Sequence, residues 1–426
     1  MTNQYVDPDK VKTPGQLLAE RTKRLQDIMA LKQPDRVPMM LDFAYMLAEM
    51  GGVTRQDFQD KPALAQELLE KAALEYQPDI AAGVFGFGPG ASIALGDQMT
   101  KWPGHGLGPD GSFQFAEQEF MKPEDYDKFL ADPSDWAIRT YLPRAFSKLG
   151  GLAALPPFGM LNFGYYHLGN LMNFATPPMM ESLKAIGEAI NATCEGLGIA
   201  IDSGQRMTNL GFAAPFFLMG ALVEAPFDFM SDTLRGMRGI FLDILRRPEK
   251  LLAAEQKVLQ FQVEFAINTA KATGLPYAFI PLHRGSDGFM SLAQFEKFYW
   301  PQLKSMMLQL IEAGITPACF YEGIWDQRLQ YLAELPKGKS FGWFQNSDIF
   351  KVKEVLGDTM CIMGGMPNSL LQGGTVEQVR QHTKKLCQVV GKGGGFMMST
   401  NIGEMEGSKP ELVRAWVDAT KEFGTY

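Results

Sequence analysis

A histidine and a glutamate stand where predicted strands give way to loops. In the segment PLHRGSDGF, His283 directly follows a predicted strand, with Arg284 and Asp287 beside it. In CFYEG, Cys319 and Glu322 fall at the end of the next predicted strand. Histidine acts as an acid, a base or a metal ligand near neutral pH, although a hydrogen-bonded structural histidine fits the same position. The setting of Glu322, an acid among aromatic residues at a strand end, favours a functional role. A free cysteine such as Cys319 is more often a core residue.

Other polar and aromatic residues follow predicted strands in the same way. Asp42 follows the first strand and is a third catalytic candidate beside His283 and Glu322. The candidates named next are each equally compatible with orienting a ligand and with a structural role. Further polar residues at strand ends are Asn346 and Glu404. The predicted substrate-binding residues are Tyr45, Phe85, Phe320, Tyr321, Phe344, Gln345 and Asn401.

Three further features are interpreted as structural. Cys361 falls early in its predicted strand, which places it in the core. His105 lies in the loop segment PGHGLG. The segment GFGPG at 86–90 lacks the full glycine spacing and the following lysine of a phosphate-binding loop, so we predict no phosphate site there.

These candidates need a scaffold that brings strand ends together, and the hydrophobic pattern predicts one. Short apolar runs alternate with longer amphipathic ones, which is typical of repeated strand–helix units. The predicted strands are 37–43, 79–85, 209–214, 277–282, 316–320, 340–344, 360–364 and 395–399. Eight parallel strands are the number that a closed (β/α)8 TIM barrel needs, and such barrels carry their chemistry at the C-terminal ends of the strands. The sequence therefore predicts an α/β fold with one TIM-barrel domain over residues 1–426.

The pattern also predicts helices and two departures from regular alternation. An N-terminal helix is expected over 14–32, and Thr375 with Gln378 forms a capping box before a late helix. Residues 99–178 are rich in loop signals and are interpreted as an insertion that caps the barrel mouth. Residues 221–273 are interpreted as a long helical excursion.

Composition narrows the environment and the partners. The net charge of -8 gives no basic surface for nucleic acid. Four cysteines without CxxC spacing favour a reducing compartment. The polar N-terminus has no apolar signal-peptide core, and no uncharged apolar stretch reaches about 18 residues, the length of a membrane span. We therefore expect a cytoplasmic protein without nucleic-acid or membrane partners, and a homodimer is compatible with the sequence.

Several motifs resemble one known superfamily. DIFKVKEVLGDTMCIMGGMPNSLLQGGTVEQVRQHTKKL resembles the uroporphyrinogen decarboxylase superfamily in its glycine-rich turn after a strand, its Leu-Leu segment, its Gly-Thr and its Glu-Val helix. RRPEKLLAAEQKVLQFQ resembles the superfamily's Pro-Glu helix, and LKQPDRVPMMLDF resembles the entry into its first strand. The resemblance covers roughly residues 15 to 425 and implies the same TIM-barrel fold.

The residues that would bind a porphyrinogen are absent. True decarboxylases carry paired arginines after the first strand, an aspartate after the second and a histidine after the last. The corresponding segments here are LDFAYMLAEMGG, AAGVFGFGPG and MMSTNIGEMEG, which lack all of them. A substrate with eight carboxylates needs cationic partners, because buried unpaired carboxylates are very costly. We therefore expect no porphyrinogen decarboxylation.

The resemblance instead extends to the superfamily branch that transfers methyl groups to and from cobalamin proteins. Members of this branch bind zinc with a His-x-Cys after the fifth strand and a Cys after the eighth. Here Cys319 and Glu322 lie near the first position, but the eighth strand ends in STN, without a cysteine. Zinc accepts nitrogen, sulfur and oxygen ligands, so His283, Cys319 and Glu322 are the candidate metal ligands. No Asp-x-His-x-x-Gly motif is present to ligate cobalt, which implies a cobalamin carried by a separate corrinoid protein.

The resemblance and the residues together predict a methyltransferase. The expected methyl donor is a small methoxylated aromatic compound, because removing methyl from an ether requires an acid or Lewis acid at the leaving oxygen. The chain is rich in Met and Phe, which suits an aromatic substrate or simply a Met-rich core. Two alternatives stay open, namely a decarboxylase or other lyase acting on a different substrate, and a non-catalytic barrel that binds a tetrapyrrole or corrinoid partner.

Overall fold

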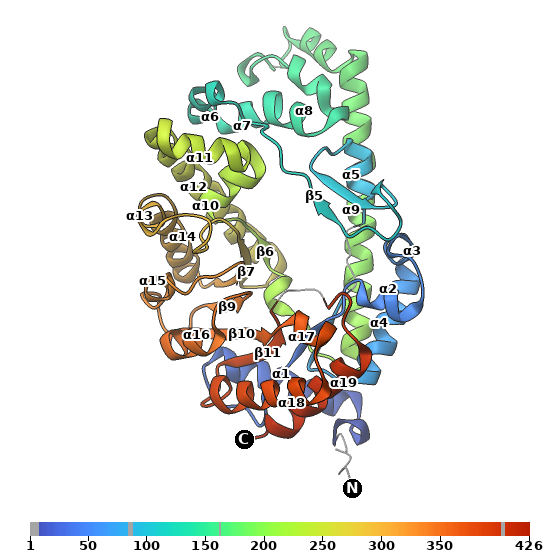
Figure 1. The fold of residues 1–426 in the computed structure, drawn as a ribbon. Coiled ribbons are helices and arrows are strands. Elements are labelled where there is room, and N and C mark those ends of the chain that lie inside the picture. The colour runs from blue at the N-terminus through green and yellow to red at the C-terminus, as the bar shows by residue number, and fades with distance from the viewer. Residues whose placement is uncertain (1–7, 84–87, 162, 402–404) are drawn as a thin grey trace.

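The computed structural model describes residues 8–83, 88–161, 163–401 and 405–426. Figure 1 shows strands surrounded by helices in the lower half of the molecule and a helical lobe above them. The long helix α9 (Pro177–Asn209) runs from the lobe down to the strands. No helix within the described ranges combines the length and the hydrophobicity that crossing a membrane requires.

Eight parallel strands form the centre of the lower half. They are β1 (Met40–Asp42), β2 (Ile80–Ala82), β6 (Ala221–Leu222), β7 (Tyr277–Leu282), β8 (Thr316–Tyr321), β9 (Phe341–Phe344), β10 (Cys361–Met366) and β11 (Phe396–Thr400). One sheet has the order β11-β10-β9-β8-β7-β6, and β1 pairs with β2. A parallel bridge between Met39 and Met398 joins the two sheets, so the strands follow one another as in a TIM barrel.

The ring is completed by an irregular segment instead of a strand ladder. In the described ranges no strand pairing links β2 to β6. The backbone N–H of Ala213 donates to the carbonyl of Asp79 (3.0 Å), and Phe217 stacks on Phe341 with ring centroids 4.7 Å apart. Residues 213–217 therefore fill the gap beside β2 and cover the lower end of the barrel interior.

Seven of the predicted strands are confirmed, and the third is corrected. Residues 209–214 are not a strand, because α9 continues to Asn209 and the chain then turns at Gly211, whose φ of +92° strongly favours glycine. The third strand is β6, inside the stretch predicted to be helical. The rest of 221–273 is mostly helical, as predicted.

Side chains alternate between the barrel interior and the helix layer, as the pleat of a strand requires. One buried cluster contains Met40, Ile80, Trp343, Cys361 and Met397 from five strands, and this cluster is the barrel interior. Cys361 is therefore a core residue, as predicted. The alternate residues of the same strands belong to a larger cluster shared with the surrounding helices.

Amphipathic helices enclose the strands, and their caps follow the sequence. Thr13 and Thr375 each accept a hydrogen bond in a capping box, as predicted for Thr375. The α-helices of the described ranges are α1 (Pro14–Met29), α2 (Met46–Gly51), α3 (Arg55–Asp60), α4 (Pro62–Tyr76), α5 (Gly90–Leu95), α6 (Tyr126–Ala131), α7 (Pro133–Trp136), α8 (Leu142–Ala145), α9, α10 (Pro226–Asp228), α11 (Gly236–Arg246), α12 (Pro248–Thr273), α13 (Leu292–Gln294), α14 (Trp300–Glu312), α15 (Leu329–Leu332), α16 (Ile349–Leu356), α17 (Asn368–Gly373), α18 (Val376–Lys385) and α19 (Pro410–Phe423).

The predicted insertion lies on the side of the barrel where the strands end. It begins with a small sheet of β3 (Thr100–Pro103), β4 (Gly106–Leu107) and β5 (Gln114–Phe115), and continues through α6 to α8 into the upper lobe. Glu117, just after β5, pairs with Arg284 at the C-terminal end of β7 (2.6 Å). Part of residues 99–178 thus reaches the C-terminal end of β7.

A buried ionic network ties the N-terminal helix to the opposite end of the barrel. Asp79, fully buried before β2, pairs with Arg24 (2.9 Å) and Arg36 (2.7 Å). Burial alone would raise the pKa of Asp79, but the arginines outweigh it and hold that pKa well below its ordinary value. The carboxylate is therefore charged and fixes α1 and the entry to β1 in place.

Candidate active site

The predicted catalytic residues project from the strand ends into the barrel mouth. Phe320 and Trp343 face the interior, with ring centroids 4.7 Å apart. Alternation then directs Glu322 and Gln345, two residues further along β8 and β9, to the same side. Ile280 and Leu282 face the helix layer, so the next residue, His283, also points inward. All three side chains are partly exposed and therefore accessible from the mouth.

His283 is held between two carboxylates. Its Nδ1 lies 2.5 Å from Asp232 Oδ2, and its Nε2 lies 3.1 Å from Glu322 Oε1. Burial alone would lower the pKa of His283, but the hydrogen bonds to Asp232 and Glu322 and the nearby negative charges raise it to about 11. The ring is therefore an imidazolium at neutral pH, with one N–H directed at each carboxylate.

Asp232 belongs to a helical turn that follows β6 directly. This turn, Phe229–Arg235, continues from α10 and places Asp232 beside both His283 and Arg284. Arg284 Nε donates to Asp232 Oδ1 (2.8 Å). Burial alone would raise the pKa of Asp232, but the hydrogen bond from His283 and the charge of Arg284 bring it below its ordinary value. Asp232 is thus the permanent negative charge of the site.

A second buried aspartate fixes the backbone after β7. Asp228 accepts hydrogen bonds from the backbone N–H groups of His283 and Arg284 (both 3.0 Å) and from the hydroxyl of Tyr299 (2.6 Å). Burial and the neighbouring charge of Asp232 raise the pKa of Asp228 to about 6. These hydrogen bonds fix the backbone of His283 at the end of β7 and so position its side chain.

A third acid, Glu224, adds a group that titrates near neutrality. It follows β6 by two residues, and its Oε2 lies 3.4 Å from the hydroxyl of Thr233. Burial, with the negative charges of Asp232 and Asp228, raises the pKa of Glu224 to about 7. Glu224 is therefore a carboxyl of the site whose charge changes near neutral pH.

Amide side chains connect the ends of four strands, β8 to β11, on the far side of the mouth. Gln345 Oε1 accepts a hydrogen bond from the backbone of Gly323 (2.7 Å). Asn401 Nδ2 donates to Asn346 Oδ1 (3.2 Å), and Asn401 Oδ1 accepts from the backbone of Asn368 (3.1 Å). These side chains hold the loops after β8, β9 and β10 in register around the opening.

Three predicted residues face away from the mouth, which corrects their expected roles. Cys319 is fully buried on the helix side of β8, where burial raises the pKa of its thiol to about 12. Tyr321 and Phe344 also face the helices and stack on each other with centroids 4.6 Å apart. The reason is the two-residue alternation, which puts neighbours of the inward residues Phe320 and Glu322 on the opposite face.

The remaining predicted residues fall into different settings. Asp42 ends β1, two residues after the inward Met40, so it faces the interior. Tyr45 is buried at the start of α2, where its hydroxyl donates to Gln59 (2.9 Å), so it does not reach the mouth. Phe85 and Glu404 lie outside the described residues.

The proposed metal ligands do not form a metal site. Within the described ranges, no group of three or more His, Cys, Asp or Glu side chains is arranged to hold a metal ion. His283 and Glu322 meet, but Cys319 points to the other side of the sheet. Both ring nitrogens of His283 are directed at carboxylates, and the described residues supply no third ligand beside His283 and Glu322. The residues present therefore do not fit zinc.

The sequence reading missed Glu224, Asp228 and Asp232. They lie in ALVEAPFDFMSDTLR, which was interpreted as part of a helical excursion. A signal was available, because Asp228 and Asp232 are four residues apart and would share one helix face. The strand before them was not recognised, since β6 has only two residues.

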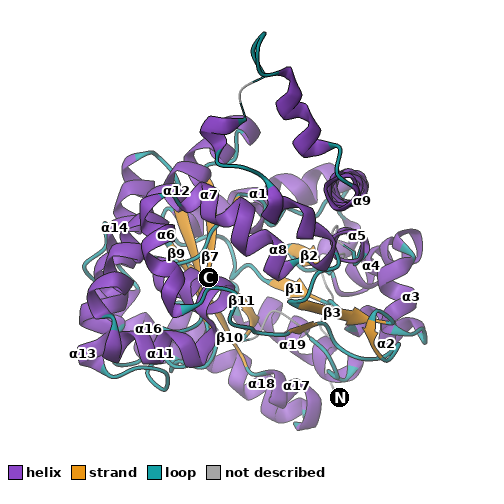
Figure 2. Ribbon diagram, turned by 90° about the horizontal axis from the view of Figure 1, so that it is seen from above, coloured by secondary structure: helices purple, strands orange, loops and turns teal. Residues whose placement is uncertain are grey.

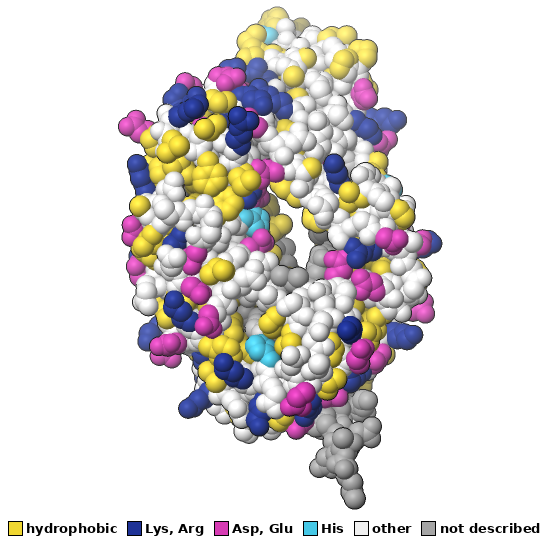
Figure 3. All heavy atoms as spheres, viewed as in Figure 1, with side chains coloured by type: hydrophobic (Ala, Val, Ile, Leu, Met, Phe, Trp, Pro, Cys, Tyr) yellow, Lys and Arg dark blue, Asp and Glu magenta, His cyan; other side chains and the backbone are white. Residues whose placement is uncertain are grey.

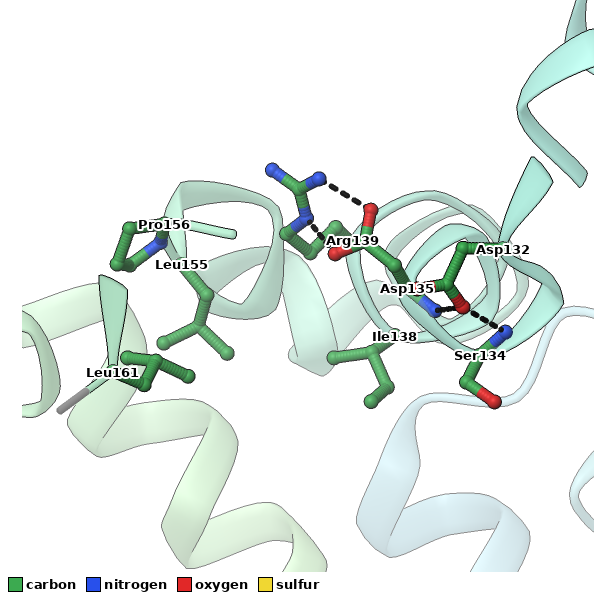
Figure 4. A pocket seen from close by; sticks show the side chains of 8 residues that line it. All are labelled: Asp132, Ser134, Asp135, Ile138, Arg139, Leu155, Pro156 and Leu161. Carbon is green, nitrogen blue, oxygen red and sulfur yellow. Dashed lines mark hydrogen bonds and ion pairs between the residues drawn. The ribbon is translucent and has the colours of Figure 1, made fainter. Parts of the chain in front are cut away.

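The face of the molecule above the strands is hollowed. Figure 3 shows an opening between the two sides of the molecule, with acidic and histidine side chains at its edge. A separate pocket of about 370 Å³ lies in the upper lobe, lined in part by Ile138, Leu155 and Leu161 (Figure 4). Its charged residues already serve structure: Arg139 pairs with Asp135, and Asp132 caps α7.

The fold and site define a parallel (β/α)8 barrel with an acid–histidine cluster at the usual place for barrel chemistry. The sequence profile of the uroporphyrinogen decarboxylase (URO-D) family matches residues 171–423, and the chain belongs to this family. A solved methyltransferase from Methanosarcina mazei is similar to this chain, with a TM-score of 0.58 and 15% identity over 95% of this chain and 98% of that one. At this identity the likeness shows the fold alone. A search of curated proteins gave no match.

Proposed function

We propose that this protein is a methyltransferase that moves a methyl group from a methoxylated aromatic compound to the cobalamin of a separate corrinoid protein. The observation that carries the proposal is the imidazolium of His283, held between Asp232 and Glu322 at an accessible barrel mouth. Breaking an aryl ether leaves negative charge on oxygen, and a positioned proton donor at that oxygen lowers the barrier.

The transfer balances with one proton from the protein. The reduced cobalt of the substrate cobalamin attacks the methyl carbon, a cobalt–carbon bond forms, and the carbon–oxygen bond breaks. The electron pair of that bond goes to the departing phenol oxygen. His283 gives its Nε2 proton to this oxygen and returns to the neutral ring. Asp232 keeps its hydrogen bond from Nδ1 throughout and holds the ring in one orientation, as the carboxylate partner of a catalytic histidine does.

The proton affinities of donor and acceptor match this step. The phenol group of tyrosine, a model for the leaving group, has a pKa of about 10. The pKa of His283 is raised to about 11 while Glu322 remains on Nε2. An ether oxygen that enters between His283 and Glu322 weakens that contact and lowers this value, so transfer to a phenolate becomes close to balanced. Glu322 therefore orients the imidazole ring and keeps it protonated until the substrate binds.

The interior aromatic residues support an aromatic substrate. Phe320 and Trp343 lie one pleat below Glu322 and Gln345 on the inward face. Aromatic rings bind well in offset or edge-on contact with such side chains. The cationic groups of the described site are His283 and Arg284, and both are already paired with carboxylates. That pairing disfavours a substrate with many carboxylates and supports a neutral ether instead.

The test is methyl transfer to free cobalamin, reduced chemically, from a panel of methoxybenzenes and methoxybenzoates, followed by the absorbance of methylcobalamin. His283→Gln keeps an N–H donor but cannot release a proton, so we expect the rate to fall about 10²–10³-fold. Glu322→Gln removes one of the two charges that hold the imidazolium and should also slow the reaction. His105→Gln is the matched control, because His105 contacts Asp60 (3.3 Å) on the surface of the insertion.

Two results would contradict the proposal. Wild-type protein that methylates cobalamin with none of these ethers would exclude the substrate class. Ether cleavage at an unchanged rate in both His283→Gln and Glu322→Gln would exclude the acid assignment, provided the variants keep the wild-type circular dichroism spectrum.

A further inference from the structure

The long helix α9 has two apolar faces, and only one of them packs against its own chain. Its buried face includes Met179, Ala185, Ala189 and Met207. On a second face, about a third of a turn away, five large apolar residues are 41–63% exposed. They are Met180, Leu183, Ile190, Leu197 and Ile201. An apolar row of this length on a solvent-facing helix indicates an interaction surface.

The exposed residues follow a heptad repeat. The five large residues fall at alternating a and d positions, and the three remaining a and d positions are occupied by Gly187, Cys194 and Gly204. This set of eight residues is called the α9 stripe. A repeat of this kind over four heptads is the pattern of a helix that pairs with another helix.

Packing against the described residues of their own chain does not require the glycines of the α9 stripe. A Cβ atom built on Gly187 or Gly204 meets no atom within 4 Å. Glycine inside a helix costs roughly 1 kcal/mol relative to alanine. Close approach by a second helix explains both glycines, because packed helices come nearest where side chains are small.

We infer that the α9 stripe binds the α9 stripe of a second copy of this chain, with the two helices antiparallel. One register pairs every a position with a d position of the second copy. In it Gly187 meets Leu197, Cys194 meets Ile190, and Gly204 meets Met180, so three of the four layers combine a small residue with a large one. A parallel pair would instead place each glycine against itself and leave gaps, which protein interiors avoid.

The charges on α9 fit this pairing. Glu181, Glu188, Glu195 and Asp202 all fall at the b position, beside the seam but outside it. The positions that flank the seam carry one charge, Lys184. Two such helices therefore meet without facing like charges across the seam, whereas an anionic membrane surface would be repelled by the acidic row. The self-complementary pattern also suits the two-fold symmetry of most homodimers.

An exposed arm extends the same surface. In Figure 2 the segment that leads into α9 projects away from the rest of the molecule. This segment includes Tyr165 and Tyr166, which are 84% and 87% exposed, and Met172, which is 68% exposed. An antiparallel pair brings each arm towards the C-terminal end of the other α9. The stripe and the arm together supply apolar surface on the order of the 800 Å² per partner of a standard interface.

The first test measures the mass of the full-length protein in solution by light scattering across a wide concentration range. We expect twice 47.3 kDa. The double variant Ile190→Glu and Leu197→Glu should be monomeric, with a dissociation constant raised at least about 100-fold by charges forced into the seam. The control is Leu245→Glu, which changes a residue that is 74% exposed on α11 and should leave the dimer intact. Circular dichroism verifies that each variant is folded.

The second test examines the register by oxidative crosslinking. Ile190→Cys should form a covalent dimer through Cys194 of the second copy, and the wild type should crosslink much less. Efficient crosslinking of wild-type Cys194 would show a parallel pair and overturn the antiparallel assignment. A monomeric wild type would overturn the whole inference, including when the stripe then binds a corrinoid protein. A dimer that survives the double glutamate variant would also overturn it.

Discussion

The carboxylate of Asp232 is expected to keep His283 protonated, and replacing it should bring the histidine into the range where it titrates. The contact joins His283 Nδ1 and Asp232 Oδ2 at 2.5 Å in a site where Asp232 is 10% exposed. An opposite charge at such a distance typically changes a pKa by about 1–3. From a starting value of about 11, Asp232→Asn should therefore lower the pKa of His283 to roughly 8–10.

The energetic consequence follows from the direction of the change. Because the pKa of His283 is higher in the folded protein than its ordinary 6.5, the pair stabilises the fold fully below pH 6.5. That contribution is lost as the pH rises through about 11. A fall of 1–3 in this pKa corresponds to about 1.4–4 kcal/mol less preference for the charged ring. In Asp232→Asn the ring should therefore lose its proton at a lower pH, and ether cleavage should decline there too.

The assay is a nuclear magnetic resonance titration of histidine-labelled protein. The chain has only four histidines, so the ring signals are few, and His283→Gln identifies the relevant one. The wild-type signal should stay constant from about pH 6 to pH 9, while the Asp232→Asn signal begins to titrate in this range. Asp60→Asn, beside the exposed His105, is the matched control and should leave His283 unchanged. A wild-type His283 that titrates near its ordinary value would refute the reasoning.

Two further predictions concern stability. Asp79→Asn should destabilise the protein by about 3–5 kcal/mol in chemical denaturation, because it leaves Arg24 and Arg36 buried without their shared carboxylate. Since folding lowers the pKa of Asp79, its contribution to the free energy of unfolding is present above pH 3.8 and fades as the pH falls towards the pKa in the folded protein. A loss under about 1 kcal/mol at neutral pH would contradict this account. Glu224→Gln should raise the free energy of unfolding at about pH 8 by up to about 3 kcal/mol, and the thermal midpoint with it. The reason is that the folded protein holds this proton to about pH 7, whereas the unfolded chain loses it near pH 4.5. The gain should vanish near pH 4, and an equal gain at both pH values would show a cause other than titration.

The proposed activity and the proposed dimer use different parts of the molecule. The acid–histidine cluster lies at the strand ends, whereas the α9 stripe faces solvent on the helix that joins the lobe to the barrel. Substitutions in the α9 stripe should therefore change the mass in solution without changing the pKa of His283. The two proposals can fail independently.

The sequence by itself determined most of the scaffold. Apolar runs of five or six residues in the C-terminal half predicted β7 to β11 within one or two residues, because a buried parallel strand has no polar alternation to obscure it. The capping box at Thr375 fixed the start of α18. Knowing that barrel strands end at one face was enough to bring His283 and Glu322 together, since neighbouring strands end side by side.

Only the tertiary structure decided which way each side chain points and what surrounds it. Cys319 and Glu322 are three residues apart, and the pleat of β8 turns them to opposite faces. Their nearness in the sequence therefore could not show which of them faces the mouth and which is a core residue. Asp232, one of the two partners of His283, comes from 51 residues earlier, after a strand too short to leave a hydrophobic signal. Charge state depends on such distant contacts, because burial and neighbouring carboxylates together set the pKa. The sequence therefore placed His283 and Glu322 at the same strand-end face, and the folded chain supplied the two carboxylates that raise the pKa of the histidine.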